Sequence, residues 1–191
     1  PHPGRVRQVR HAPGDRTQAR RSARSGAEQP VQANPVAGHI AANYGMFQDN
    51  NTQTNGGVTT ANLMLLRTTD FANGVSIASD SRITVQTGGV YNIQFSSQFS
   101  RAGGTGFSTV EVWLGKNGSN LAETNGQVNI PQSGGKAIAS WNYLVQANAG
   151  DYFEMYWSSA DTGVQMWFGD VGTDPTRPET PSVIVTVTQV A

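Results

Sequence analysis

The chain has 191 residues, of which 37% are hydrophobic and only 14% are charged, and it contains 22 glycines. This composition is typical of many short strands joined by tight turns, and the length suits one β-sandwich domain with an additional segment. The chain has no cysteine, which excludes disulfides and thiolate metal sites. It also has no run of 18 apolar residues and no charged-then-apolar leader, so we expect a soluble protein.

The formal net charge of zero conceals two oppositely charged parts. Residues 1–37 carry seven Arg against Asp15 and Glu28, which gives 7 − 2 = +5, whereas residues 38–191 carry 6 − 11 = −5. The first part contains no Leu, Ile, Phe, Tyr or Trp, so it cannot bury enough apolar surface to offset the entropy of ordering itself. We predict an Arg-rich extended arm and linker over residues 1–37 and a folded domain over residues 38–191.

Local signals inside the arm predict one short helix followed by a linker. Asp15 and Gln18 resemble a capping pair, and Gly26 is a stop signal. About ten residues are marginal as an isolated helix. Pro30 and Pro35 then favour extended chain. At roughly 3.3 Å per residue the straightened arm could span about 120 Å, enough to reach neighbouring subunits.

After residue 42 the apolar pattern becomes that of strands separated by turn signals. The cleanest alternation runs from Tyr91 to Phe99, with apolar residues mainly on one side and Asn, Gln and Ser on the other. Asn117-Gly118 ends another strand and is the strongest short signal for a hairpin. No stretch predicts a long helix. The strand predictions cover residues 43–47, 58–70, 75–85, 88–100, 108–118, 120–130, 139–157, 165–169 and 182–190.

The segment from Ala139 to Trp157 is predicted to be the densest part of the core. Apolar residues recur at period two from Trp141 to Ala147, and again from Phe153 to Trp157. Asn148 to Asp151 between them supply turn chemistry, because glycine tolerates positive φ and Asn and Asp bond their own backbone. The pattern predicts two strands of one hairpin with a shared core-facing side.

The last strand, residues 182–190, has apolar groups on both faces. A strand that is apolar on both sides is buried on both sides, and in a two-layer sandwich the second burial must come from another subunit. We therefore predict a homotrimer. The residues assigned to its interface are Val183, Ile184, Val185, Val187 and Leu144.

The domain lacks the residues of common catalytic sites. The histidines are His2, His11 and His39, all in or beside the arm, so no imidazole base, Ser/His pair or His metal site is available. The nearest carboxylate pairs are Asp151 with Glu154 and Asp170 with Asp174, which are interpreted as turn and surface residues. We predict no enzymatic activity and no cofactor.

Two further ligand hypotheses follow from loop composition. Asp49-Asn50-Asn51 and Asp161 could supply oxygen ligands to calcium, but no EF-hand pattern surrounds them, and we predict no metal site. The glycine clusters at 103–106 and 134–135 lack the Lys-Ser/Thr of a phosphate loop and are interpreted as loop tips.

The order of several short motifs resembles the C1q/TNF-like jelly roll over residues 43–190. The motifs are G-x-Y-x-I-x-F from Gly89, V-W-L-x-K-N-G from Val112, A-G-D-x-F from Ala149, and the apolar C-terminal strand. The Asn- and Thr-rich style is similar to structural proteins of tailed bacteriophages, including head decoration proteins and fibre tips. The resemblance implies a ten-strand, two-sheet sandwich that trimerises with its terminal strand near the threefold axis. The chain has no collagen-like Gly-X-Y stem, so an extracellular immune role is not expected.

Three hypotheses remain open for the arm: a solvated tail, a nucleic-acid-binding arm of a jelly-roll coat protein, and an anchor on an acidic protein shell. Arginine binds phosphate without sequence preference, whereas the interleaved Val6 and Val9 favour a protein partner. We predict a capsid decoration (cement) protein on the virion surface, bound to the major capsid protein shell. The anchoring residues would be Arg5, Arg7, Arg10, Arg16, Arg20, Arg21 and Arg24.

The alternative from another class is the receptor- or carbohydrate-binding tip of a phage fibre. In that hypothesis exposed aromatic residues, such as Trp113, Tyr156 or Trp167, stack on sugar rings. A fibre tip usually follows a long stem, whereas 37 residues precede this domain. No membrane partner is expected for either function.

Overall fold

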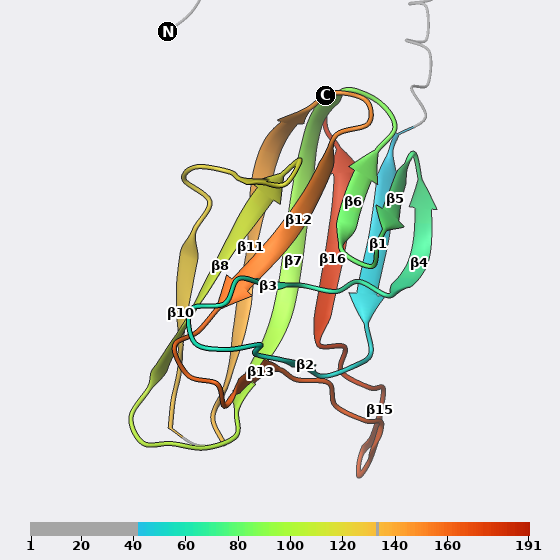
Figure 1. The fold of residues 1–191 in the computed structure, drawn as a ribbon. Helices are drawn as coiled ribbons and strands as arrows, with labels where there is room; N and C mark the ends of the chain where they lie inside the picture. Colours follow the sequence, from blue (N-terminus) through green and yellow to red (C-terminus); the bar gives the residue numbers. More distant parts are fainter. Residues whose placement is uncertain (1–41, 133) are drawn as a thin grey trace, which may run out of the picture. The chain divides into compact units, whose positions relative to one another are not determined.

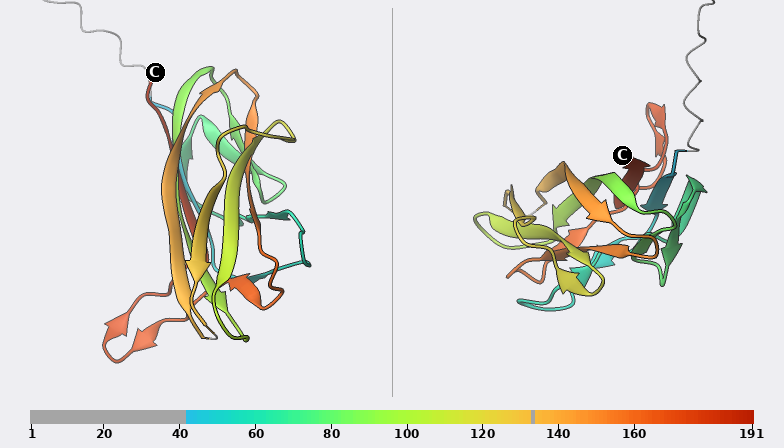
Figure 2. Two further views of the ribbon diagram at one scale, coloured as in Figure 1. Left: turned by 90° about the vertical axis from the view of Figure 1, so that its left-hand side faces the viewer. Right: turned by 90° about the horizontal axis from the view of Figure 1, so that it is seen from above.

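Two antiparallel β-sheets face each other in the computed structural model, which describes residues 42–132 and 134–191 (Figures 1 and 2). No helix occurs within these residues, so the prediction of an all-β domain is confirmed. Nothing in this range is a helix able to cross a membrane. The arm predicted over residues 1–37 lies outside the described residues.

The first sheet, called sheet A, is centred on β7. This strand pairs with β11 on one side and with β16 on the other, and β1 and β4 continue the sheet beyond β16. Past the end of β16, β7 pairs with β13, which in turn pairs with β2. The strands of sheet A are β1 (Tyr44–Asp49), β2 (Gln53–Thr54), β4 (Thr68–Asn73), β7 (Gly89–Arg101), β11 (Lys136–Ala147), β13 (Val164–Met166) and β16 (Val183–Gln189).

The second sheet, sheet B, has the order β10-β8-β12-β6-β5. Two-residue strands add to it, since β3 pairs with β12 and β9 pairs with β8. Its strands are β3 (Asn62–Leu63), β5 (Val75–Ala78), β6 (Arg82–Val85), β8 (Ser108–Lys116), β9 (Ser119–Asn120), β10 (Gly126–Ile130) and β12 (Tyr152–Ser158). A separate hairpin of β14 (Gly172–Thr173) and β15 (Thr176–Arg177) projects from one end of the sandwich (Figure 2).

The predicted hairpin of residues 139–157 is wrong in its pairing. Both strands and the turn exist, but β11 pairs with β7 in sheet A and β12 pairs with β8 in sheet B. The turn therefore carries the chain from one sheet to the other. Period-two burial is the same for two strands that lie side by side and for two that face each other across a core, so the pattern could not separate these cases.

A network around Asp151 fixes this crossing. Its carboxylate lies 2.8 Å from the Lys116 ammonium and accepts hydrogen bonds from the Asn117 side chain and the Asn148 amide, each at 2.7 Å. These contacts, led by that with Lys116, lower the pKa of Asp151 to about 2. Asn117 and Gly118 both have positive φ and close the predicted hairpin between β8 and β9, which is confirmed.

The two sheets meet in an aromatic core. Phe99 on β7 contacts Trp157 on β12 edge to face, with ring centroids 5.4 Å apart. Phe95 contacts the ring of Trp141 at 4.7 Å and stacks on Tyr143 at 6.0 Å. The alternation predicted along β7 and the shared core-facing side of β11 and β12 are thereby confirmed. Residues 58–70, predicted to contain one strand, form two, the short β3 and β4.

The C-terminal strand β16 occupies the middle of sheet A, between β1 and β7. Val183, Val185 and Val187 are 0%, 0% and 1% exposed and belong to the core of the chain itself. On the opposite face, Ile184 and Thr186 are half-buried. The assignment of Val183, Val185 and Val187 to a subunit interface is wrong, because the facing sheet already buries them. Only the opposite face, with Ile184, is left for a second subunit.

Replacing Val185 by Asp should prevent stable folding, since the carboxylate would enter a core without a partner. We expect a loss of more than about 4 kcal/mol in the free energy of unfolding. Val58→Asp, at a 57% exposed position in the loop between β2 and β3, is the matched control. Thermal denaturation followed by circular dichroism measures both variants; equal melting temperatures would contradict the assignment of Val185 to the core.

Candidate functional site

The outward side of sheet A is a broad surface with almost no charge, here called the sheet A face. In the register of the four central strands, Leu144 lies beside Asn92, Thr188 and Tyr44, and Asn142 lies beside Gln94, Thr186 and Met46. Of the outward-facing residues that the structure describes on these strands, only Lys136 is charged. The face comprises Tyr44, Met46, Gln48, Asn92, Gln94, Ser96, Gln98, Ile138, Ser140, Asn142, Leu144, Gln146, Ile184, Thr186 and Thr188.

Exposed apolar side chains lie on both sides of the sheet A face. Ile138 and Leu144 on β11 are 59% and 67% exposed. Across the sheet, Phe71 on β4 is 56% exposed and contacts Tyr44 edge to face at 6.0 Å. Exposed apolar groups on a surface without charges are typical of a protein contact.

The five residues predicted for the trimer interface divide between the two sides of sheet A. Leu144 is exposed on the sheet A face and Ile184 is half-buried there. The other three, Val183, Val185 and Val187, face the core, where they are not available to a partner. Ile138 was not predicted as a contact residue, although it shares the parity of Leu144 and lies on the face opposite to Tyr143. That parity was the available signal.

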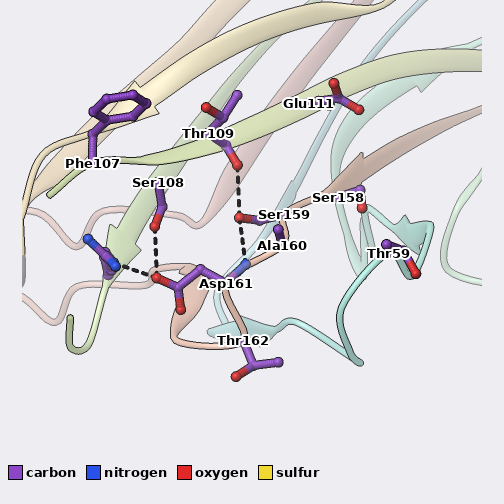
Figure 3. Close-up of a pocket in the computed structure, with 11 residues that line it drawn as sticks. Thr59, Phe107, Ser108, Thr109, Glu111, Ser158, Ser159, Ala160, Asp161 and Thr162 are labelled. Carbon is purple, nitrogen blue, oxygen red and sulfur yellow. Dashed lines mark hydrogen bonds and ion pairs between the residues drawn. The ribbon is translucent and has the colours of Figure 1, made fainter. Parts of the chain in front are cut away.

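The outer side of sheet B carries a polar groove of about 670 Å³ beside Asp161 (Figure 3). Asp161 lies 2.6 Å from the Nε of Arg101, and its carboxylate accepts hydrogen bonds from the Ser108 hydroxyl at 2.7 Å and the Gly163 amide at 2.8 Å. Arg101 is only 8% exposed and also donates to the carbonyl of Gly106 at 2.8 Å. This network ties the 101–108 loop to the 159–163 loop.

The electrostatics of the network explain why the carboxylate is stable there. The hydrogen bond from Ser108, followed by those from Gly163 and Arg101, lowers the pKa of Asp161, while burial opposes this effect. Both carboxylate oxygens are engaged by protein groups. The geometry therefore assigns Asp161 a structural role at the base of the groove.

The other carboxylates considered from the sequence are also engaged internally. Asp49 is fully buried, 2.6 Å from Arg67, and accepts hydrogen bonds from the side chains of Gln53 and Asn51. Glu154 pairs with Arg82 at 3.3 Å. The described residues contain no cluster of three or more metal-ligating side chains.

The remaining predicted carboxylate pairs do not form a shared site. Asp151 is held by Lys116, whereas Glu154 accepts from Ser81 and from the Tyr156 hydroxyl. Asp170 and Asp174 are both exposed. In none of these does the structure show two carboxylates converging on one point, which acid–base catalysis by a pair requires.

The three tryptophan and tyrosine residues considered for sugar binding lie in two places. Trp113 and Tyr156 stack on the outer side of sheet B, with ring centroids 5.6 Å apart and an angle of 12° between the planes. Trp167 follows β13, and the Lys136 ammonium lies 3.1 Å from its ring centroid. The arginines assigned to capsid anchoring, Arg5 to Arg24, lie outside the described residues.

Replacing Asp161 by Asn should lower the melting temperature near neutral pH by roughly 5 °C, because Arg101 loses its charged partner. A lowered pKa means that ionised Asp161 stabilises the fold fully above the unfolded-state pKa of about 3.9. That stabilisation disappears as the pH falls through the lower folded-state value. The gap between wild type and variant should therefore close in acid, measured by thermal denaturation from neutral pH to about pH 2.

Asp170→Asn, a change at an exposed carboxylate, is the control. It should leave the melting temperature unchanged at every pH. A constant gap between wild type and Asp161→Asn across the whole range would contradict the proposed ion pair.

No protein-family model matches the chain, and no curated protein matches it significantly. The function of the chain is therefore inferred from its strand order, its two outer faces and the composition of residues 1–37. Of these, the sheet A face has the clearest character of a contact surface, since it combines few charges with exposed apolar side chains on both of its sides.

Proposed function

We propose that the protein is a non-enzymatic capsid decoration protein that forms a homotrimer through the sheet A face. In this proposal the β-domain is a C1q/TNF-like jelly roll, and the Arg-rich residues 1–37 form an extended arm that anchors it to the major capsid protein shell of a virion. The observation that carries the proposal is the sheet A face, on whose four central strands Lys136 is the one charged outward residue among those described, with exposed apolar side chains on both of its sides.

The strand order supports the jelly-roll assignment. The longer strands number five in each sheet, in the orders β4-β1-β16-β7-β11 and β5-β6-β12-β8-β10. Consecutive strands β7, β8, β10, β11 and β12 mostly alternate between the sheets, and the last strand returns to lie beside the first. Such long connections across the open ends of two antiparallel sheets are characteristic of double Greek-key sandwiches.

The exposed apolar side chains on the two sides of the sheet A face support a cyclic trimer. In a cyclic trimer each subunit uses two different patches, because the head of one contacts the tail of the next. Leu144 on β11 supplies one such patch and Tyr44 with Phe71 the other, on opposite sides of the same face. The Asn, Gln, Ser and Thr side chains between them can hydrogen-bond across an interface without the desolvation cost of charges.

The charge division supports a role for the arm. Residues 1–37 have a net charge of +5 and the remainder −5, so the arm adds positive charge to an acidic domain. Arginine forms bidentate hydrogen bonds with carboxylates, and Val6, Val9 and Pro3 add apolar contacts. This mixture favours an acidic protein surface over a nucleic acid, for which apolar residues are of less use.

The proposal predicts that the purified protein has the mass of a trimer in light scattering at micromolar concentration. Leu144→Asp should reduce it to monomers, because a charge would be buried at the contact. Thermal denaturation of the dissociated monomer should still be cooperative, since Leu144 lies outside the core.

Val58→Asp is the matched control, because Val58 is 57% exposed and lies in the loop before β3, a strand of sheet B. It should leave the trimer intact. A monomeric wild-type protein, or a Leu144→Asp variant that remains trimeric, would reject the sheet A face as the assembly surface.

The arm is tested by replacing its seven arginines with glutamine in the full chain. We expect the variant to remain trimeric but to lose binding to DNA-free capsids of the parent virus. Wild-type binding to these capsids should survive a moderate rise in salt, since apolar contacts contribute. Cosedimentation of protein with empty capsids at two salt concentrations measures both quantities.

A nucleic-acid arm would behave differently. It would bind free duplex with an affinity that falls steeply with salt, with a log–log slope of up to about −0.9 per neutralised phosphate. Salt-sensitive binding to DNA without binding to empty capsids would therefore replace the anchor proposal with the coat-protein alternative.

A further inference from the structure

The outer side of sheet B contains two grooves that meet at one residue. The groove of about 670 Å³ beside Asp161 and a second groove of about 290 Å³ beside Trp113 are both lined by Glu111. Phe107, Thr109, Glu111 and Trp113 alternate along β8 and the residue before it, so their side chains fall on the same side of the strand. At about 3.3 Å per residue this row is roughly 20 Å long.

The smaller groove has a rigid aromatic wall. One face of Trp113 is covered by the stacked ring of Tyr156, and its Nε1 donates a hydrogen bond to Asn120 Oδ1 at 2.9 Å. The Tyr156 hydroxyl is fixed in turn by Glu154 at 3.0 Å. Gly115 is needed beside this pair, since a Cβ there would approach Tyr156 to 2.7 Å. The indole is thus held in place while part of its surface remains available to the groove.

The other walls of the smaller groove carry both hydrogen-bond acceptors and donors. Glu111 is positioned by Gln127, which donates to Oε1 at 2.7 Å, so Oε2 remains available. Glu123 and Asn125 add a carboxylate and a carboxamide. Glu123 has φ of 63°, a conformation that glutamate rarely adopts and that is concentrated at functional sites.

The larger groove continues the same chemistry along β8. Figure 3 shows Phe107, Thr109 and Glu111 following one another along the strand, with Asp161 and Thr162 across from them. Phe107 is 68% exposed at the rim. Asp161 and Arg101 are engaged with each other, and the Thr109 hydroxyl donates to Asn129 at 2.9 Å. The groups left to contact a ligand are therefore the aromatic ring, the glutamate and the hydroxyls of Thr59, Ser158 and Thr162.

We propose that these joined grooves bind a neutral oligosaccharide along β8. The C–H groups of a pyranose ring carry partial positive charge and pack on the negative face of an indole or phenyl ring. Sugar hydroxyls both donate and accept hydrogen bonds, which matches carboxylates, carboxamides and hydroxyls together. The row from Phe107 to Trp113 is longer than one sugar ring, so the ligand is an oligosaccharide.

The charges of the grooves determine the class of saccharide. Glu111 and Glu123 are the charged residues left without a cationic partner among those lining the two grooves, and both are acidic. A phosphorylated or sulfated ligand would be repelled, which excludes nucleic acids from this surface as well. A purely cationic ligand would leave the carboxamide and hydroxyl donors without acceptors.

This inference goes beyond assembly and does not depend on it. The sheet A face and the grooves lie on opposite sides of the sandwich, so the protein can bind a saccharide as a monomer or as a trimer. Binding and oligomeric state are measured separately, and either proposal can fail while the other holds.

The experiment is isothermal titration of the full chain with a panel of neutral tetrasaccharides: α- and β-linked glucose, β-linked galactose and β-linked N-acetylglucosamine. A sulfated oligosaccharide and tetramethylammonium are titrated as the anionic and cationic comparisons. At least one of the neutral tetrasaccharides should bind. Trp113→Ala and Glu111→Gln should each weaken that binding at least about tenfold. Phe107→Ala should also weaken binding, and because Phe107 is exposed at the rim, this variant leaves the core unchanged. Circular dichroism melting verifies that each variant is folded.

Trp167→Ala is the matched control, because Trp167 is a half-buried tryptophan outside both grooves, and its variant should bind as the wild type does. Failure of all four saccharides to bind at millimolar concentration would overturn the proposal. So would binding restricted to sulfated oligosaccharides or to tetramethylammonium, or a loss in Trp167→Ala equal to that in Trp113→Ala.

Discussion

The packing of β7 against the facing sheet is the interaction on which the rest of the structure depends. One side of this strand supplies Tyr91, Ile93, Phe95 and Phe99 to the core, while its edges pair with β11, β16 and β13. Every strand of sheet A is positioned directly or indirectly by β7, and contacts such as that between Phe99 and Trp157 join it to sheet B. Loss of this burial would remove both sheets together.

The inner side of each sheet packs in the core, so the outer sides of the two sheets can differ in composition. The sheet A face is broad and carries few charges, as suits contact with another copy of the chain. Sheet B instead carries grooves, a stacked Trp113–Tyr156 pair and uncompensated glutamates. The two proposals assign these sides to assembly and to saccharide recognition, so a bound ligand and a neighbouring subunit would not compete.

Charged groups inside the domain mainly fix loops rather than create reactive sites. Asp151 with Lys116 holds the crossing between the sheets, Asp161 with Arg101 joins two loops, and Asp49 with Arg67 fixes the end of β1. Each pair includes at least one largely buried or half-buried group, so it contributes more to stability than a fully solvated pair does. Because the pKa of Asp161 is lowered, its ion pair should persist below the pH at which an ordinary aspartate is protonated.

The sequence alone determined most strands and, where the alternation is regular, the side that is buried, because period-two alternation is a local property, clearest from Tyr91 to Phe99. Pairing was decided only by tertiary structure, since residues 139–157 would show the same alternation as a hairpin or as a crossing between sheets. The residues of the proposed subunit interface also could not be assigned from the sequence alone. Val185 and Leu144 are both apolar, but only the position of their strands shows that one enters the core and the other faces outward. The grooves along β8 also required the fold, because Glu111 and Trp113 become a site only when the loop carrying Glu123 and the strand carrying Tyr156 are brought beside them.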